Sequence, residues 1–273
     1  MYKKVLLETK TNEVIYMTSP NIQAAHAFTT RYGGVSRGIY MSLNLGVNSG
    51  DDLSGVRENY SLICSAIGIS ADDIVCSRQI HSARIRVVGR GDRGYLFKPT
   101  PYEADGLITS DAGVALTVFT ADCVPILLHD PVRGAIGAVH SGWRGTALDV
   151  VGAAVRMMKS EFQCVPGDIA AAIGPCISKC CYETEQDVVD ALGQVLPDAV
   201  EKCVEPRGYK FMVDLKEANR LLLLNAGVSD IIISDDCTSC HSDKYWSHRR
   251  TSGKRGSQAA IISIRQHMTE AMT

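Results

Sequence analysis

Several features that would assign a protein to a broad class are missing from this chain of 273 residues. No apolar run approaches the about 20 residues that a membrane-spanning helix needs. The first residues, MYKKVLLETKTNEVIY, contain neither an apolar segment of sufficient length nor a small-residue cleavage site, so nothing marks the chain for secretion. We therefore expect a soluble, cytoplasmic protein without a membrane partner.

Strong charge and low-complexity segments are also missing. The formal net charge is -2, and no basic stripe is interleaved with aromatic residues, which argues against a nucleic-acid partner. No Pro/Gly/Ser-rich linker, charge block or repeat of fixed period divides the chain. We expect a single domain over residues 1–273 that acts on a small molecule, as a monomer or a homodimer.

The elements that are present indicate a strand-rich protein. Short β-branched segments, most of them bounded by Gly, Pro or Asp, recur along the chain. Helices are predicted after Asp51-Asp52, after Gly145-Thr146, from about Glu185 to Leu196 and from Asp214 to Asn225. The buried face of the second helix is predicted from apolar residues at steps of three and four: Ala147, Leu148, Val151, Ala154, Val155 and Met158. This composition of elements is typical of an α/β or α+β sandwich.

Three residues supply a ligand set for a metal ion: His81 in RQIHSARI, Cys123 in FTADCVPILLHDP and His140 in GAVHSGWRGT. Two imidazoles and one thiolate leave a tetrahedral ion one open position, whereas a structural zinc is closed by four protein ligands. Taken singly, a cysteine in an apolar run is most often a small buried hydrophobe. Taken together, the three predict a catalytic metal that acts through a bound water.

Local sequence suggests how two of these ligands meet. Pro125 follows Cys123 between two apolar stretches and indicates a bend that exposes the thiol. The strand that ends at His140 can return alongside, because strands adjacent in sequence commonly pair. The segment HSGWRGT then predicts a turn into a helix whose first N–H groups could bind an anion.

The ten cysteines lie in a chain without an export signal, which favours reduced thiols over a disulfide framework. Cys237 and Cys240 form a C-x-x-C pair. The other close group, Cys176, Cys180 and Cys181, lacks the second C-x-x-C of a ribbon-type zinc site. Spacing therefore argues against a second metal.

A resemblance extends over nearly the whole chain. In order, the segments HAFTTRYGGVS, SLNLG, VRENY, RQIHSARI, EADGLITS, TADCVPILLHDP, AVHSGWRGT, AAIGPCI, CYE and HRRTSGKRGSQAAII resemble the laccase-domain family, also called multicopper polyphenol oxidase or purine nucleoside phosphorylase. The resemblance implies a layered α/β/β/α sandwich of the type shared with the catalytic domain of the cytotoxic necrotizing factors. It also implies a metal site, usually described as zinc, at His81, Cys123 and His140.

The activities implied by the resemblance are phosphorolysis of adenosine, inosine and methylthioadenosine, together with deamination of adenosine. Other members are named for polyphenol oxidation or for editing of peptidoglycan precursors. Multicopper oxidation needs a three-copper cluster with about eight further imidazoles. This chain has seven histidines and no His-x-His pair, so zinc is favoured, although the ligand set also takes Cu²⁺.

A third reading treats Cys123 and His140 as nucleophile and base of an amide hydrolase. A thiolate bound to zinc is shielded, whereas a free thiolate beside a histidine is alkylated readily. The two roles of Cys123 exclude each other, so labelling of the thiol distinguishes them.

Phosphorolysis requires groups that bind purine nucleoside and phosphate. Arginine holds phosphate in a bidentate fork, and Arg144 beside the predicted helix start is the first candidate. Further candidates for the substrate and phosphate are Arg31, Asn44, Arg249 and Arg250. Asp122 and Asp105 are candidates to orient a histidine or hold water, with Glu183 a weaker one. The general acid or base stays open.

Overall fold

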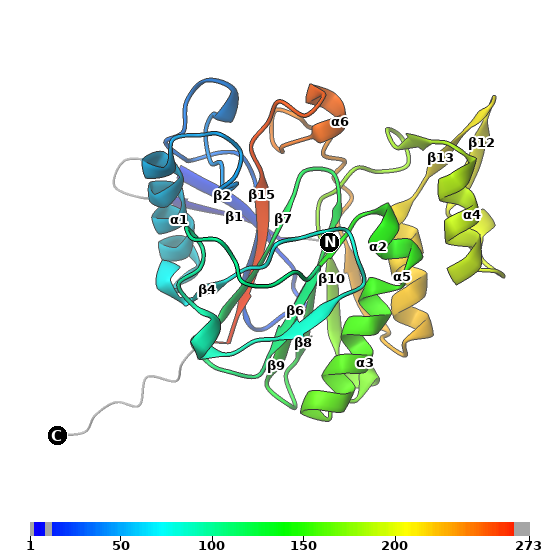
Figure 1. Ribbon diagram of the computed structural model, residues 1–273, viewed down its shortest axis with the longest axis horizontal. Helices are drawn as coiled ribbons and strands as arrows, with labels where there is room; N and C mark the ends of the chain where they lie inside the picture. Colours follow the sequence, from blue (N-terminus) through cyan, green and yellow to red (C-terminus); the bar gives the residue numbers. More distant parts are fainter. Residues whose placement is uncertain (1–2, 9–12, 265–273) are drawn as a thin grey trace.

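The computed structural model describes residues 3–8 and 13–264, and its centre is formed by two six-stranded sheets (Figure 1). The first sheet has the order β1 (Lys3–Glu8), β2 (Glu13–Thr18), β3 (Ala25–Thr29), β15 (Gln258–Ser263), β7 (Ala115–Thr120) and β4 (Ile74–Val75). The second has the order β14 (Asp230–Ile233), β10 (Ala170–Ile173), β8 (Val124–Asp130), β9 (Ala135–Ser141), β6 (Gly106–Thr109) and β5 (Ile85–Val87).

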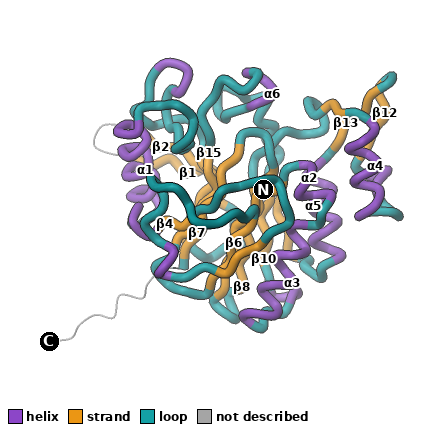
Figure 2. Tube along the Cα trace, in the orientation of Figure 1, coloured by secondary structure: helices purple, strands orange, loops and turns teal. Residues whose placement is uncertain are grey.

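Helices lie on the outer sides of the sheets, as the purple segments of Figure 2 show. The α-helices are α1 (Leu53–Ile67), α2 (Trp143–Ala147), α3 (Val150–Phe162), α4 (Gln186–Val195), α5 (Leu215–Asn225) and α6 (His248–Thr251). Short 3-10 turns occupy Gly38–Tyr40, Ala71–Asp73, Arg90–Asp92, Pro166–Asp168 and Val200–Lys202. A small third sheet, β11 (Glu183–Thr184), β13 (Lys210–Val213) and β12 (Val204–Arg207), lies beside α4.

Side chains point alternately to the two faces of each sheet, and together with the helices they form a hydrophobic core in three parts. Leu127 packs between the sheets with Phe28 and Leu116, while its neighbours Ile126 and Leu128 face the layer of α3 and α5. Helix α1 covers the outer face of the first sheet. Successive strand residues point to opposite faces, so a fully buried strand such as β8 is apolar throughout. This arrangement confirms the expected layered α/β/β/α sandwich.

Three of the four predicted helices have the expected starts. Asp52 caps α1 by accepting from Ser54 N, and Asp214 caps α5 by accepting from Glu217 N. Glu185 precedes α4 directly.

The second predicted helix is wrong in its start and its continuity. Helix α2 begins at Trp143, not after Thr146. The helix is interrupted before α3, because Asp149 has a left-handed backbone conformation at φ 54 and its side chain accepts from Gly152 N. Leu148, predicted on the buried face, is 58% exposed in that break. Ala147 is half-buried, and the remaining apolar positions of the face, Val151, Ala154, Val155 and Met158, are buried as expected.

The predicted return of the His140 strand is confirmed. Strands β8 and β9 form an antiparallel hairpin in which Val124 pairs with Ser141 and Pro125 with His140. Cys123 therefore lies one residue before the first pair, in the turn after β7. The hairpin fixes Cys123 and His140 at the same end of the second sheet.

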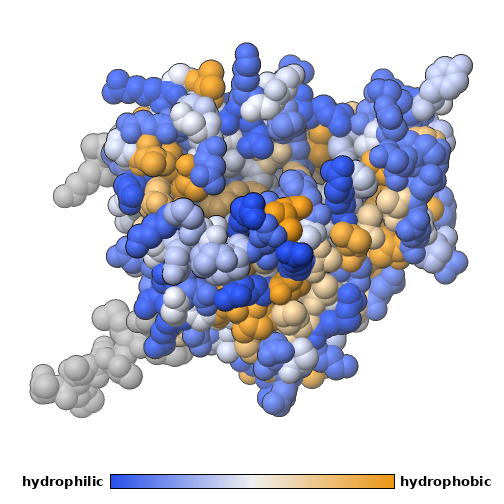
Figure 3. Space-filling view, in the orientation of Figure 1, coloured by the Kyte–Doolittle hydropathy of each residue, from blue (hydrophilic) through white to orange (hydrophobic). Residues whose placement is uncertain are grey.

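Hydrophilic side chains cover most of the face seen in Figure 3, and hydrophobic ones form small separate patches there. Within residues 3–8 and 13–264, no helix combines the length and apolar character that crossing a membrane requires.

Candidate metal centre and cleft

The three predicted ligands meet in the structure. The ligand atoms of His81, Cys123 and His140 lie within 4.8 Å of one another, and Nε2 of His81 is 3.9 Å from Sγ of Cys123. Around a tetrahedral zinc, a nitrogen and a sulfur ligand are about 3.6 Å apart. His140 is buried, Cys123 half-buried and His81 exposed, so the group opens towards solvent on the His81 side. The donor set and its spacing fit one ion with an open position.

Asp105 organises two of the ligands. Its Oδ1 accepts from Nδ1 of His140 at 2.9 Å and from the backbone N–H of His81 at 2.9 Å. Its Oδ2 accepts from both the N–H and the hydroxyl of Ser82. A carboxylate only accepts hydrogen bonds, so Nδ1 of His140 carries the proton and Nε2 is left for a metal. The predicted orienting role of Asp105 agrees with these contacts.

Gly142 leaves the space that the ligands occupy. A Cβ at this position would lie 2.9 Å from Cδ2 of His81 and 3.1 Å from Sγ of Cys123. These distances are shorter than ordinary carbon contacts, so a larger residue would displace a ligand. Gly142 also precedes α2 directly, which brings the start of that helix against the thiol.

Two non-glycine residues beside the ligands have left-handed backbones: His81 itself at φ 60 and Asp122 at φ 90. Such conformations persist where surrounding contacts hold them. Asp105 holds the N–H of His81. Asp122 accepts from Oγ1 of Thr238 and from the N–H of Arg249, both at 2.6 Å. The side-chain oxygens of Asp122 thus tie distant segments to the Cys123 turn, whereas one of its predicted roles was to orient a histidine.

The electrostatics of the cluster favour ionised groups. Burial opposes ionisation of Cys123, but the charge of His140 and hydrogen bonds from both histidines lower its pKa to about 6. Burial likewise opposes protonation of His140, yet the Cys123 thiolate and Asp105 raise its pKa to about 9. Burial would raise the pKa of Asp105, and the hydrogen bonds from His140 and Ser82 hold it well below its usual range instead. Thiolate is the form of cysteine that binds metal and attacks carbon.

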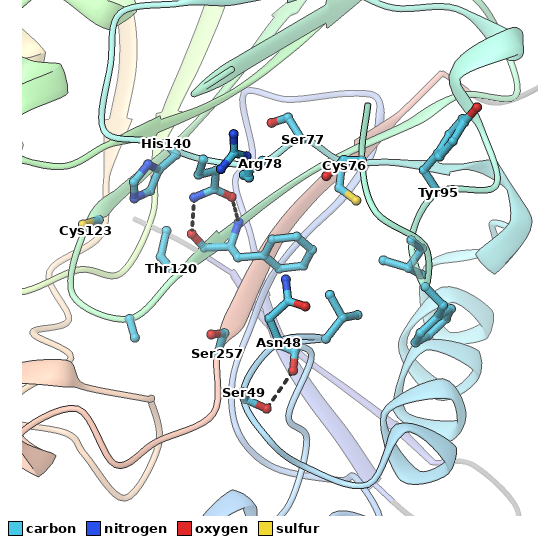
Figure 4. A pocket seen from close by; sticks show the side chains of 18 of the residues that line it. Asn48, Ser49, Cys76, Ser77, Arg78, Tyr95, Thr120, Cys123, His140 and Ser257 are labelled. Atoms are coloured by element: carbon cyan, nitrogen blue, oxygen red, sulfur yellow. Dashed lines mark hydrogen bonds between the residues drawn. The ribbon is translucent and has the colours of Figure 1, made fainter. Parts of the chain in front are cut away.

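The ligands form one end of a cleft of about 860 Å³ (Figure 4). Cys123 and His140 lie together at that end, and Tyr95 lies at the opposite end. The lining of the cleft also includes cationic and aromatic side chains: Arg78, Lys98, Arg255, His248, Phe97 and Phe119. The cleft therefore offers a metal site, positive charge and flat apolar surfaces to one ligand.

Among the residues that line the cleft, Arg255 has a hydrogen-bond donor without an acceptor. Its NH1 donates to Gly256 O and Ser257 Oγ, while its Nε is buried without a partner. Burial lowers its pKa, and the negative charges of Asp122 and Cys123 oppose that shift. Arg255 was not predicted from the sequence, although it lies in the segment HRRTSGKRGSQAAII, shortly before the buried strand β15.

The predicted substrate residues lie elsewhere. Arg31 stacks over Trp246 at 3.9 Å and donates to Met41 O and Ser242 O. Asn44 is buried and bonded to Ser49, Asp51, Gly46 and Ser257. Arg144, Arg249 and Arg250 are exposed. None of these five residues lines the cleft.

Arg144 and Arg249 nevertheless share a location near the thiol. Arg249 lies over the ring of Tyr182 at 5.4 Å. Burial and the Cys123 thiolate raise the pKa of Tyr182, and the charges of Arg249 and Arg144 oppose that rise. Both arginines thus lie on the Tyr182 side of Cys123. Glu183, the weaker acidic candidate, pairs with Lys210 at 3.3 Å and is not among the residues that line the cleft.

Comparison with known proteins decides the family. The model of the family described as multi-copper polyphenol oxidoreductase laccase matches residues 25–265. The chain belongs to this laccase family. A protein of Geobacillus stearothermophilus named purine nucleoside phosphorylase YlmD is 40% identical over 256 residues, covering 92% of this chain and 93% of the relative. A prokaryotic protein named adenosine deaminase RL5 is 34% identical over 239 residues, covering 84% of this chain and 90% of the relative.

The laccase-family fold is also found in a solved structure. The crystal structure of YlmD from Geobacillus stearothermophilus aligns with a TM-score of 0.87 at 36% identity, covering 97% of this chain and all of the other. The resemblance seen in the sequence is thereby confirmed. Relatives named as enzymes support an enzyme of this laccase family, and the His81, Cys123 and His140 group is its candidate metal site.

Proposed function

We propose that this protein is a zinc-dependent purine nucleoside phosphorylase that acts on adenosine, inosine and methylthioadenosine and also deaminates adenosine. The observation that carries the proposal is a His₂Cys group that opens into a cleft of about 860 Å³, which has room for a nucleoside and has cationic and aromatic walls. The names of the relatives support the reaction class. The proposed partners are a purine nucleoside and phosphate.

A zinc ion held by His81, Cys123 and His140 would supply a Lewis acid at the end of the cleft. The residues around it prepare that site. Asp105 fixes the tautomer of His140 and the backbone of His81, and Gly142 leaves room for both side chains and the thiolate. A fixed ligand shell loses little freedom when an ion binds, which favours tight binding.

For the phosphate we propose Arg255 as the main contact. An unpaired buried donor costs about 1–3 kcal/mol, so a turn of the Arg255 side chain that brings its Nε to an oxyanion in the cleft would be favoured. Arg255 also lies within electrostatic reach of Cys123, so an anion there would be close to the metal site. Arg144, Arg249 and Arg250, with Arg31 and Asn44, remain candidates from the sequence, and alanine variants of Arg144 and Arg255 distinguish the first of them from Arg255.

For the purine we propose the aromatic part of the cleft. Phe119 lies at the end of β7, and its backbone N–H and C=O are both bonded to the side-chain amide of Gln79, at 2.7 and 2.8 Å. This pair of bonds holds the wall in place. Flat purine rings stack favourably on such aromatic faces.

The experiment is a product assay with purified protein. Adenosine, inosine and methylthioadenosine are each incubated with and without phosphate, and the products are separated by chromatography. Free base and ribose 1-phosphate that require phosphate support phosphorolysis, and inosine formed from adenosine supports deamination. An unchanged panel from fully metal-loaded protein would refute the proposal. A parallel arm with a catechol, copper and oxygen tests the oxidase reading.

One observation favours the amide hydrolase as a second candidate: the lowered pKa of Cys123 beside two histidines. In that case His140, as the base, would have taken the proton of the Cys123 thiol, the thiolate would attack an amide carbonyl, and His140 would return the proton to the leaving amine. Rapid alkylation of Cys123 that added zinc does not slow would support the hydrolase. Protection of the thiol by one equivalent of zinc would support the phosphorylase.

A further inference from the structure

A second group of thiols lies outside the cleft. Cys180 and Cys181 precede β11, and Cys237 and Cys240 follow β14. The Sγ of Cys240 lies 3.5 Å from that of Cys180 and 3.4 Å from that of Cys181, which are 3.8 Å from each other. All four sulfurs lie within 4.8 Å of one another. The fold thus gathers a four-cysteine cluster from two segments about sixty residues apart.

The spacing of the sulfurs is that of a tetrathiolate site. Zinc–sulfur bonds of about 2.3 Å in tetrahedral geometry place the sulfurs about 3.8 Å apart. A disulfide would need a distance of about 2.05 Å, and all four cysteines are free. The arrangement therefore matches four ligands around one ion more closely than it matches a bonded pair.

Backbone contacts fix the cluster from both segments. Cys176 and Cys237 form a parallel bridge, and Thr238 N donates to Cys176 O at 3.0 Å. The N–H of Ser178 donates to Sγ of Cys237 at 3.3 Å, and those of Ser239 and Cys240 also approach this sulfur. N–H groups directed at a cysteine sulfur stabilise its thiolate form. Cys176 itself donates to Ile177 O at 3.3 Å and stands apart from the cluster.

We propose that Cys180, Cys181, Cys237 and Cys240 bind one zinc ion as a closed structural site, separate from the His81, Cys123 and His140 group. Four thiolates are soft ligands that select zinc over hard cations such as magnesium, and they leave no position for water or substrate. The site does not rest on the proposed nucleoside chemistry.

The second site would also affect the position of Cys123. The N–H of Ile177 donates to Asp122 O at 3.0 Å, and Oγ1 of Thr238 donates to Asp122 Oδ1 at 2.6 Å. Both segments of the cluster are therefore hydrogen-bonded to Asp122, the residue directly before Cys123. Arg249 adds a bond to Cys181 O at 3.2 Å. An ion bound to the cluster would fix both segments, and their hydrogen bonds to Asp122 would then position the turn that carries the Cys123 thiol.

The test measures zinc per chain by mass spectrometry of the metal in the full-length protein, purified under reducing conditions and desalted. The wild type is compared with His81→Ala/Cys123→Ser, with Cys180→Ser/Cys240→Ser and with Cys64→Ala as a control at a buried cysteine outside both groups. We expect two zinc ions in the wild type and the control and one in each double variant. Absence of zinc from His81→Ala/Cys123→Ser would overturn the second site while leaving the nucleoside proposal to its own assay.

A measurement on the unaltered chain covers the case in which the cluster variant does not fold. Cys180 and Cys240 are exposed, so as free thiols they are accessible to an alkylating reagent at alkaline pH. We expect zinc-loaded protein to label at these positions at least about tenfold more slowly than protein treated with a strong chelator. Equal labelling, or a disulfide between these cysteines in the reduced preparation, would refute the proposal.

Discussion

The carboxylate of Asp105 connects His140 to His81: one oxygen accepts from the ring of the first and from the backbone of the second, each at 2.9 Å. Two ligands, His140 on β9 and His81 in the loop between β4 and β5, are thus oriented by a single buried group. Loss of that group should disturb both ligands at once while leaving the sheets in place.

Asp105→Asn tests this connection. Asparagine keeps one acceptor oxygen, and its NH₂ group would face donors that now give hydrogen bonds to the carboxylate, so the orientation of the two ligands is less well fixed. We expect zinc affinity to fall by about 10- to 100-fold, measured by competition with a chromophoric chelator. Asp198→Asn, at an exposed carboxylate, is the control and should retain wild-type affinity. Equal affinity in both variants would contradict the role of Asp105.

Gly142→Ala tests the space at the metal site. The backbone of Gly142, at φ -73 and ψ 174, suits alanine, so the change introduces only the contacts of its Cβ with His81 and Cys123. We expect bound zinc to fall well below one equivalent at the cleft while the far-ultraviolet circular dichroism stays that of the wild type. Gly167→Ala, where a Cβ meets no atom within 4 Å, provides the matched control. Full zinc binding by Gly142→Ala would show that the ligands can move aside.

The pH dependence of Cys123 follows from its lowered pKa. A lowered value keeps the thiolate present at lower pH, so the metal-free protein should react with iodoacetamide along a curve centred near pH 6, where a pKa of about 6 places the midpoint. An ordinary thiol would show a midpoint near 8.5. Peptide mapping distinguishes Cys123 from Cys64 and Cys76, whose pKa values burial raises to about 12 and 11. A midpoint above pH 8 for Cys123 would contradict the pairing with His140.

Arg255→Ala and Arg144→Ala separate two proposed phosphate contacts. We expect Arg255→Ala to raise the apparent KM for phosphate by about tenfold or more, as loss of a charged hydrogen bond does, with a smaller effect on the KM for nucleoside. Arg144→Ala should raise it too if the sequence-based assignment holds. Arg207→Ala, exposed on β12, is the control. Phosphate dependence that changes in Arg144→Ala alone would move the phosphate site to the Tyr182 side of Cys123.

The Cys123–His140 half of the metal site could be predicted because it is local. One hairpin carries both residues, and pairing of neighbouring strands with a proline-marked bend placed them together. His81 was predicted as a ligand from residue type and family resemblance, whereas its approach depends on Asp105 and on a left-handed backbone. Neither leaves a periodic pattern in the sequence.

Other parts escaped prediction for physical reasons. The strands of the third sheet are short, and β12 is mostly exposed and contains Pro206, so they lack the apolar runs that mark buried strands. The interruption between α2 and α3 could not be predicted, because the apolar residues keep a helical period across it. It depends on a single residue, Asp149, whose carboxylate caps α3. The four-cysteine cluster was missed because two of its members are adjacent and the bridge between Cys176 and Cys237 brings the segments together.

The register of the β8–β9 hairpin has a wider consequence for how this protein is monitored. A slip of one residue between the strands would turn the buried side chains of β9 towards the opposite layer and would carry His140 away from Cys123. Burial of the β9 side chains and the geometry of the metal ligands thus both depend on the same β8–β9 register. Occupancy of the cleft by zinc, counted apart from zinc in the four-cysteine cluster, should then measure the fraction of molecules in a preparation that have the native strand alignment.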